Sequence, residues 1–250
     1  MRLIKNRWFQ VAVAIAVCSI LILFFLWFSS VDHRKIAGKS PERFPVPASE
    51  PGSFSFFDLN AGSRFSTALR SVLNEKLGAD AYETRTVIDL ELHEKGFLAE
   101  NFPGLDALNR QLNYLPGERV EHDTVQLTYR YARHENTPFE FVRIMFSGDS
   151  DAPLFIKIQA KQEGVGVLDS IRVKYGPPAT RQWVDGNGKS HFWEKQGDLL
   201  IISETKNRIG TPQYHFGFYF VNNIKALLEK EQAARLQHRK GLEKTGQTAF

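Results

Sequence analysis

The sequence TVQLTYRYAR at residues 124–133, followed after the loop HENTP (residues 134–138) by FEFVRIMF at residues 139–146, decides the fold class. In the first segment, apolar and aromatic residues alternate with polar ones. A period of two places the two kinds of side chain on opposite faces of a strand. The short loop then predicts that the two segments pair as a β-hairpin, the basic unit of an antiparallel sheet.

Further strands and helices are predicted on both sides of this hairpin. Strand patterns lie at residues 84–93, 154–160, 181–184, 190–194, 199–204 and 214–221. Helices are predicted at residues 63–77, 105–115, 165–175 and 223–240. Gly, Pro and Asn separate most of these segments, as in the turn DGNG at residues 185–188, because these residue types favour turns.

The order of these elements predicts an α+β domain rather than a doubly wound parallel sheet, because strands follow one another instead of alternating with helices. We expect an antiparallel sheet that is packed by helices on one face. Residues 54–160 and residues 161–240 each contain a helix that is ended by glycine and followed by several strands. This order suggests two related αβββ halves. Residues 241–250 are predicted to be a disordered tail.

The second half contains a short motif that is similar to a known family. A predicted helix ends at YGP, residues 175–177, and short antiparallel strands that carry Trp183 and Trp193 follow it. In this respect residues 168–221 resemble the small α-β-β-β modules of the SmpA/OmlA envelope lipoproteins. The chain differs from that family because it has a helix anchor instead of a lipid anchor, and an additional first half. The resemblance implies a protein-interaction module of the cell envelope without catalytic activity.

The N-terminal region contains a predicted transmembrane helix from Trp8 to Phe28, a stretch of 21 residues without a charge. At about 1.5 Å of rise per residue, this stretch can cross a hydrocarbon core of about 30 Å. A cleaved signal peptide is the alternative. The stretch is longer than an ordinary signal sequence, however, and it ends in FFLWF at residues 24–28, where a peptidase requires small residues. The lipid bilayer is therefore an expected partner.

The flanks of this helix predict the topology of the chain. Residues 1–7 are a short basic tail that is too small to form a domain, so we expect them in the cytoplasm. Residues 29–53 are predicted to be a linker, since three prolines lie among Ser, Lys, Glu and Gly. The C-terminal domain is then expected outside the cytoplasm, in the periplasm if the cell is Gram-negative.

Charge and cysteine content limit the classes of function. The chain has 32 Lys and Arg and 28 Asp and Glu; removing the five basic and one acidic residues of the first 35 leaves 27 of each in residues 36–250. The domain is therefore neutral and has no overall charge that would attract nucleic acid. Cys18 is the only cysteine and lies in the predicted span. The domain therefore has no disulfide, thiolate zinc site or thiol nucleophile.

No sequence motif predicts an enzyme. Gly148, Asp149 and Ser150 follow a predicted strand and are similar to the nucleophile block of GDSL-type esterases, but no histidine has the Asp three residues before it that this family requires. No pair of histidines has HxxxH spacing, and Walker, GxGxxG and GxSxG motifs are absent from the sequence. We therefore expect no catalytic residue, no cofactor and no metal ligand.

The densest group of aromatic residues gives the expected binding surface. Trp183, Trp193 and Tyr214 lie in or beside predicted strands, and a tryptophan on an outward face would line a groove or patch for a partner. The sequence thus predicts a non-enzymatic, membrane-anchored domain that binds an envelope protein or the cell wall. A small-ligand or sensory domain with an aromatic pocket is the alternative. A hydrolase that uses polar loop residues such as Asp149, Ser150 and a histidine is a third hypothesis.

Overall fold

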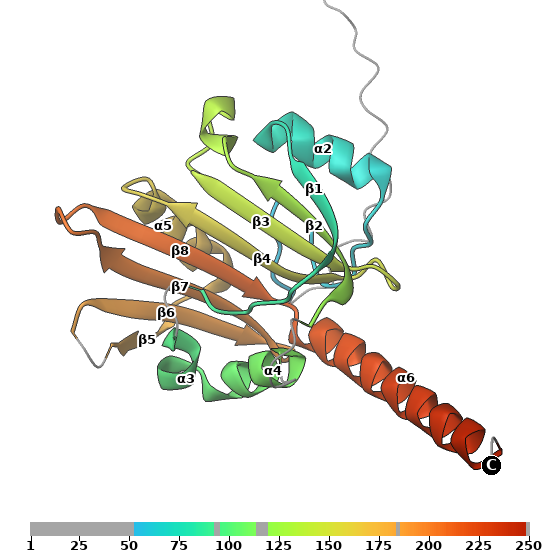
Figure 1. The fold of residues 1–250 in the computed structure, drawn as a ribbon. Helices are drawn as coiled ribbons and strands as arrows, with labels where there is room; N and C mark the ends of the chain where they lie inside the picture. The colour runs from blue at the N-terminus through green and yellow to red at the C-terminus, as the bar shows by residue number, and fades with distance from the viewer. Residues whose placement is uncertain (1–52, 93–95, 114–119, 184–185, 249–250) are drawn as a thin grey trace, which may run out of the picture. The chain divides into compact units, whose positions relative to one another are not determined.

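The computed structural model describes residues 53–248 apart from residues 93–95, 114–119 and 184–185 (Figure 1). The predicted cytoplasmic tail, the predicted transmembrane helix and nearly all of the predicted linker lie outside the described residues. Within the described part, no helix combines the length and the apolar character that crossing a membrane requires.

The centre of the domain is an eight-stranded antiparallel sheet (Figure 1). Its strands are β1 (Ala81–Thr86), β2 (His122–Tyr129), β3 (Phe141–Ser147), β4 (Pro153–Ala160), β5 (Ala179–Gln182), β6 (Gly188–Lys195), β7 (Asp198–Lys206) and β8 (Pro212–Tyr219). The helices are α2 (Thr67–Leu77), α3 (Phe97–Asn101), α4 (Pro103–Asn113), α5 (Gly164–Tyr175) and α6 (Val221–Thr248), with a short 3-10 helix η1 (Ala132–Glu135). The predicted α+β class with an antiparallel sheet is confirmed.

Two four-stranded meanders make up this sheet, in the order β1-β2-β3-β4-β8-β7-β6-β5. The last strands of the two meanders, β4 and β8, pair with each other, and Ile158 lies opposite Phe216. α2 precedes the first meander and α5 precedes the second, while α3 and α4 lie between β1 and β2. Each half therefore supplies a helix followed by four strands, one strand more than the suggested αβββ order contains.

Helices cover both faces of the sheet, which corrects the expectation of a single covered face. On the first face, α2, α5 and Phe54 pack against a core that includes Ile156. On the second face, α3, α4, the first turns of α6 and Leu90 pack against a core that includes Phe155. Neighbouring side chains point to opposite faces of a strand. The burial of both Phe155 and Ile156 on β4 therefore requires a cover on each side.

The predicted strand at residues 84–93 is a strand only at its beginning. β1 ends at Thr86, where its pairing with β2 becomes irregular and where Arg85 has a positive φ of 55°. Ile88 and Leu90 are buried in the second-face core although they follow the end of the strand. Their alternating pattern therefore marks an extended segment that lies against the sheet instead of pairing within it.

Side chains take the place of a neighbouring strand along this extended segment. The Oδ1 of Asn109 accepts a hydrogen bond from the NH of Leu90 at 2.9 Å, and the Nδ2 of Asn113 donates to the carbonyl oxygen of Ile88 at 2.8 Å. The Tyr219 hydroxyl donates to the carbonyl oxygen of Leu90 at 2.8 Å. Buried main-chain polar groups need such partners, and α4 and β8 supply them here.

The C-terminal helix α6 is longer than the sequence pattern predicts. It begins at Val221 and continues to Thr248, so residues 241–248, which we expect to be disordered from the sequence, are helical. Its first turns are buried through the apolar side chains Ile224, Leu227 and Leu228. By contrast, every residue from 232 to 245 is exposed. We call residues 232–245 the α6 arm, which is drawn at the red end of the colour scale (Figure 1).

Candidate functional site

The three aromatic residues that the sequence predicts to bind a partner are all buried. Trp183, Trp193 and Tyr214 are 8%, 6% and 4% exposed. Trp183 belongs to the second-face core, where its indole NH donates to Ser190 Oγ at 2.7 Å. Its ring meets that of Phe97 in a T-shaped contact with 5.3 Å between the centroids. Trp183 is therefore a core residue that joins β5 and β6 to α3.

Trp193 and Tyr214 belong to the opposite, first-face core. The indole NH of Trp193 donates to the carbonyl oxygen of Gly176, just after α5, at 2.9 Å. The ring of Tyr214 lies so close to α5 that a Cβ added at Gly164 would be 2.3 Å from it. The expectation of an outward tryptophan is therefore wrong, because both faces of the sheet are covered and each side of β6 leads into a core.

His191 lies in a small polar cluster beneath α5. Its Nδ1 is 3.0 Å from the hydroxyl of Thr180, and its Nε2 is 3.6 Å from a carboxylate oxygen of Glu204. Burial lowers the pKa of His191, and the positive charges of Arg172 and Lys189 act in the same direction. These contacts hold β5 to β6 and β7, so we interpret the cluster as structural.

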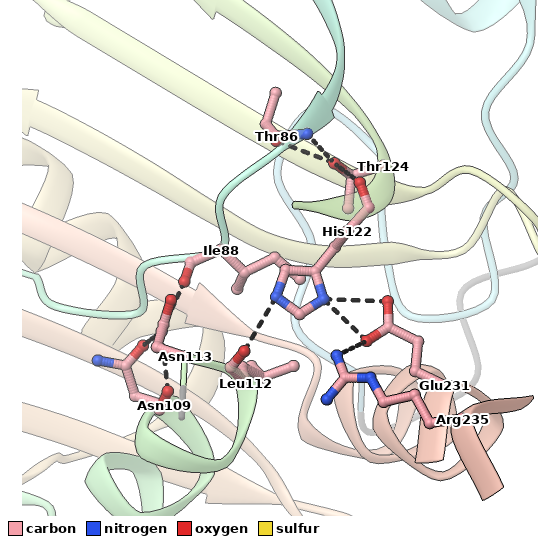
Figure 2. Close-up of polar contacts among 9 residues, drawn as sticks. All are labelled: Thr86, Ile88, Asn109, Leu112, Asn113, His122, Thr124, Glu231 and Arg235. Carbon is pink, nitrogen blue, oxygen red and sulfur yellow. Dashed lines mark hydrogen bonds and ion pairs between the residues drawn. The ribbon is translucent and has the colours of Figure 1, made fainter. Parts of the chain in front are cut away.

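His122 forms a polar junction between the domain and α6 (Figure 2). The ring is 1% exposed at the start of β2. Its Nδ1 lies 3.0 and 2.9 Å from the two carboxylate oxygens of Glu231, and its Nε2 lies 3.1 Å from the carbonyl oxygen of Leu112. The guanidinium of Arg235 lies 3.6 Å from the same carboxylate. Both ring nitrogens therefore face oxygen atoms of other residues. We call these four residues the His122 junction.

Neighbouring polar contacts fix the elements that carry the His122 junction (Figure 2). The hydroxyl of Thr124 accepts a hydrogen bond from the NH of Thr86 at 3.0 Å, which ties β2 to the end of β1. The Asn113 side chain links α4 to the carbonyl of Ile88. The sequence does not predict this junction, because Glu231, the partner of His122, lies 109 residues later in the chain and no local pattern connects the two.

Asp198 provides a further anchor at the beginning of α6. It is buried at the start of β7. Burial raises the pKa of Asp198 to about 6, while hydrogen bonds from the main-chain NH groups of Asn222 and Val221 act in the opposite direction. A carboxylate at this position interacts favourably with the positive end of the helix dipole. The start of α6 is thus held by Asp198, by apolar packing and by the His122 junction.

The residues of the hydrolase hypothesis lie in the turn between β3 and β4. Asp149 forms an ion pair with Lys230 of α6, and the NH of Ser150 donates to Ser147 Oγ at 3.4 Å. His122 lies on the neighbouring strand, but both of its ring nitrogens are engaged in its junction. The described residues therefore form no nucleophile–base pair at this turn. Within the same described ranges, no group of three or more His, Cys, Asp or Glu could hold a metal ion.

Comparisons of this chain with protein-family models, with curated proteins and with solved structures give no match. The function is therefore inferred from the residues of this chain alone. The buried aromatic residues form the two cores, and the buried polar clusters hold elements together. The α6 arm is one surface that these roles leave unexplained.

Proposed function

We propose that this protein is a single-pass membrane protein whose extracytoplasmic α+β domain binds another protein of the cell envelope, without catalysis. The uncharged stretch from Trp8 to Phe28 supports the membrane anchor. The resemblance of residues 168–221 to the SmpA/OmlA modules supports an envelope location. That region holds α5 and four strands, β5 to β8, whereas the α-β-β-β order of the family has three.

The observation that carries the interaction is the exposure of the α6 arm. Leu236 and Leu242 are 54% and 60% exposed, and the other residues of the arm are exposed as well. The preceding turns of the same helix bury Ile224, Leu227 and Leu228 against the domain. The packed part of α6 thus ends near the His122 junction, and the arm continues as an exposed helix (Figure 1).

An exposed helix of this kind gains little stability from the rest of the domain. Isolated helices shorter than about 12–15 residues are marginal in water, because most helical stability in proteins comes from the packing of one face. The arm also contains Gly241 and Thr245, both of which have low helix propensity. A partner that covers one side of the arm would supply the missing packing, which is our physical reason for assigning recognition to it.

The charge of the arm indicates an acidic partner. Four basic residues and Glu243 give residues 232–245 a net charge of +3 (four minus one), although residues 36–250 as a whole are neutral. The basic residues are Arg235, Arg239, Lys240 and Lys244. Arg239 lies 3.1 Å from Glu243, but such exposed pairs contribute little to stability. Because charge complementarity steers association, we propose an acidic surface of an envelope protein as the occupant.

Photo-crosslinking in native membranes tests this proposal. Benzoylphenylalanine at position 236 or 242 of the full-length protein is expected to give one discrete protein adduct after irradiation. With the crosslinker at position 236, the double variant Arg239→Glu and Lys240→Glu should reduce the yield of that adduct by about tenfold or more. The reason is that the two changes turn the net charge of the arm from positive to negative.

The matched controls use the exposed side of helix α5. A crosslinker at Val173, which is 89% exposed, should not give this adduct. The charge-reversing pair Arg172→Glu and Lys174→Glu should leave the adduct of position 236 unchanged. The absence of a protein adduct, an equal yield from position 173, or crosslinking to lipid alone would contradict the proposal.

A further inference from the structure

Two basic side chains lie next to each other on the second face of the sheet. Arg143 of β3 and Lys157 of β4 are direct partners in the antiparallel register, and the Cβ atoms of such pairs are about 4.5–5.5 Å apart. Like charges at opposite positions of a sheet destabilise it. Neither cation forms an ion pair with a carboxylate among the residues that the structure describes. The pair therefore needs a physical explanation.

Lys157 is held by main-chain oxygens rather than by acidic side chains. Its ammonium group donates to the carbonyl oxygens of Asp89 and Glu91, and a third N–H remains. The two carboxylates are engaged with the main chain, since Glu91 accepts the NH of Leu98 and Asp89 accepts the NH of Glu91. Burial lowers the pKa of Lys157 to about 8; the charge of Asp89 opposes this effect, and that of Arg143 adds to it.

Arg143 and Thr128 carry buried polar atoms without a partner. The Nε of Arg143 and the Oγ1 of Thr128 are both buried and make no hydrogen bond, and Thr128 as a whole is only 3% exposed. Thr128 lies opposite Arg143 in the pairing of β2 with β3. Thr128, Arg143 and Lys157 therefore form one row across three strands. An unmade hydrogen bond of this kind destabilises the folded state, and such atoms are rare in native proteins.

Phe141 helps to hold the guanidinium of Arg143 in place. The Cζ atom of Arg143 lies 5.3 Å from the centroid of the Phe141 ring, within the range of a cation–π contact. Arg143 and Lys157 are both only half-buried, so part of each side chain faces solvent while the Nε of Arg143 is buried. The row thus combines a buried hydroxyl with two adjacent cations, one of which, the guanidinium of Arg143, lies over an aromatic ring.

We propose that the row of Thr128, Arg143 and Lys157 binds the phosphate group of a ligand. A phosphate monoester carries a charge of about −1.5 to −2 at neutral pH, which matches two cations, whereas a carboxylate matches one. A guanidinium can contact two phosphate oxygens at once. The Thr128 hydroxyl and the remaining N–H of Lys157 can donate to other oxygens. The phosphate can belong to a soluble ester or to a lipid headgroup, and the test separates these sources.

The test measures the midpoint temperature of thermal unfolding of the full-length protein in non-ionic detergent, while inorganic phosphate is added at constant ionic strength. A saturable rise of the midpoint is expected. In Arg143→Gln and in Lys157→Met, the phosphate concentration that gives half of this rise should increase by about tenfold or more. Sodium acetate at the same ionic strength should not raise the midpoint. The same titration with phosphatidate in mixed micelles tests the lipid source.

The control variant is Lys161→Gln. Lys161 lies just after β4 and pairs with Glu140, so it does not belong to the row. This variant should respond to phosphate like the wild type. Because both test variants remove a like-charge repulsion, they should fold, and their midpoints without phosphate verify this. A response to phosphatidate alone assigns the site to lipid headgroups, and a response in both titrations assigns it to the phosphate group in general. Equal responses of wild type and both variants, an equal effect of acetate, or no response in either titration would overturn the proposal.

Discussion

The variant Trp193→Ala is expected to lose about 3–5 kcal/mol of unfolding free energy. Trp193 is buried in the first-face core, so truncation leaves a cavity. The carbonyl oxygen of Gly176 also loses the indole NH that donates to it at 2.9 Å, which adds the cost of an unmade hydrogen bond. Chemical denaturation of the full-length protein in detergent, followed by far-UV circular dichroism, measures the loss.

The variant Trp193→Phe leaves a smaller cavity than Trp193→Ala. It keeps a buried aromatic ring but removes the indole NH and part of the ring volume, so a smaller loss of about 1–2 kcal/mol is expected. A Trp193→Ala variant that keeps its stability within about 0.5 kcal/mol, as most surface variants do, would show that Trp193 is not a core residue. The outward tryptophan of the sequence-based prediction would then return as a candidate binding residue.

The variant Phe216→Ala is also expected to lose about 3–5 kcal/mol, and its effect should spread to both halves of the domain. Phe216 is fully buried on β8, opposite Ile158 of β4 and Ile202 of β7. It therefore lies where the two four-stranded meanders meet. Because the sheet is continuous across this point, the amides of β2 and of β6 should lose hydrogen-exchange protection together.

The control for this prediction is Phe216→Leu, which conserves more of the buried volume and should cost about 1.5 kcal/mol or less. Hydrogen exchange read by mass spectrometry resolves the two meanders separately. Loss of protection in β5 to β8, with full protection in β2 and β3, would show that the halves unfold independently. That result would contradict the description of the sheet as one cooperative unit.

The hairpin of β2 and β3 shows what a local sequence pattern can determine. β2 and β3 pair with Val125 opposite Phe146 and with Tyr129 opposite Val142, within a few residues of the predicted segments. Helices α2, α4 and α5 likewise lie close to their predicted ranges. In each case the signal is local. Strands are indicated by a period of two, and helices by apolar residues at helical spacing that end before a helix-breaking residue.

Local sequence patterns do not show which distant elements of the fold pack over a given strand or extended segment. The residues around Leu90 alternate like a strand, but their main chain is paired with the side chains of Asn109, Asn113 and Tyr219. Alternation tells which residues share a face of a strand, yet not whether another layer covers that face. For this reason the pattern predicts an outward tryptophan, while Trp183 and Trp193 lie in two opposite cores.

Local sequence patterns also do not predict which residues come together at the candidate site. The sequence predicts a helix at residues 223–240, and the structure confirms it as part of α6. The residues that anchor it, however, are His122 and Asp198, and each belongs to a strand far from α6 in the sequence. The row of Thr128, Arg143 and Lys157 forms only because β2, β3 and β4 pair in one particular register.

The proposed function requires a membrane helix at residues 8–28 that holds the α+β domain outside the cytoplasm, and cysteine labelling tests this topology. Cys18 is the only cysteine, so a Cys18→Ala background allows one new cysteine to be followed at a time. Val173→Cys, on the exposed side of α5, should react with a membrane-impermeant maleimide in intact spheroplasts. Asn6→Cys should react only after the spheroplasts are opened. Labelling of position 173 only in opened spheroplasts would contradict this topology.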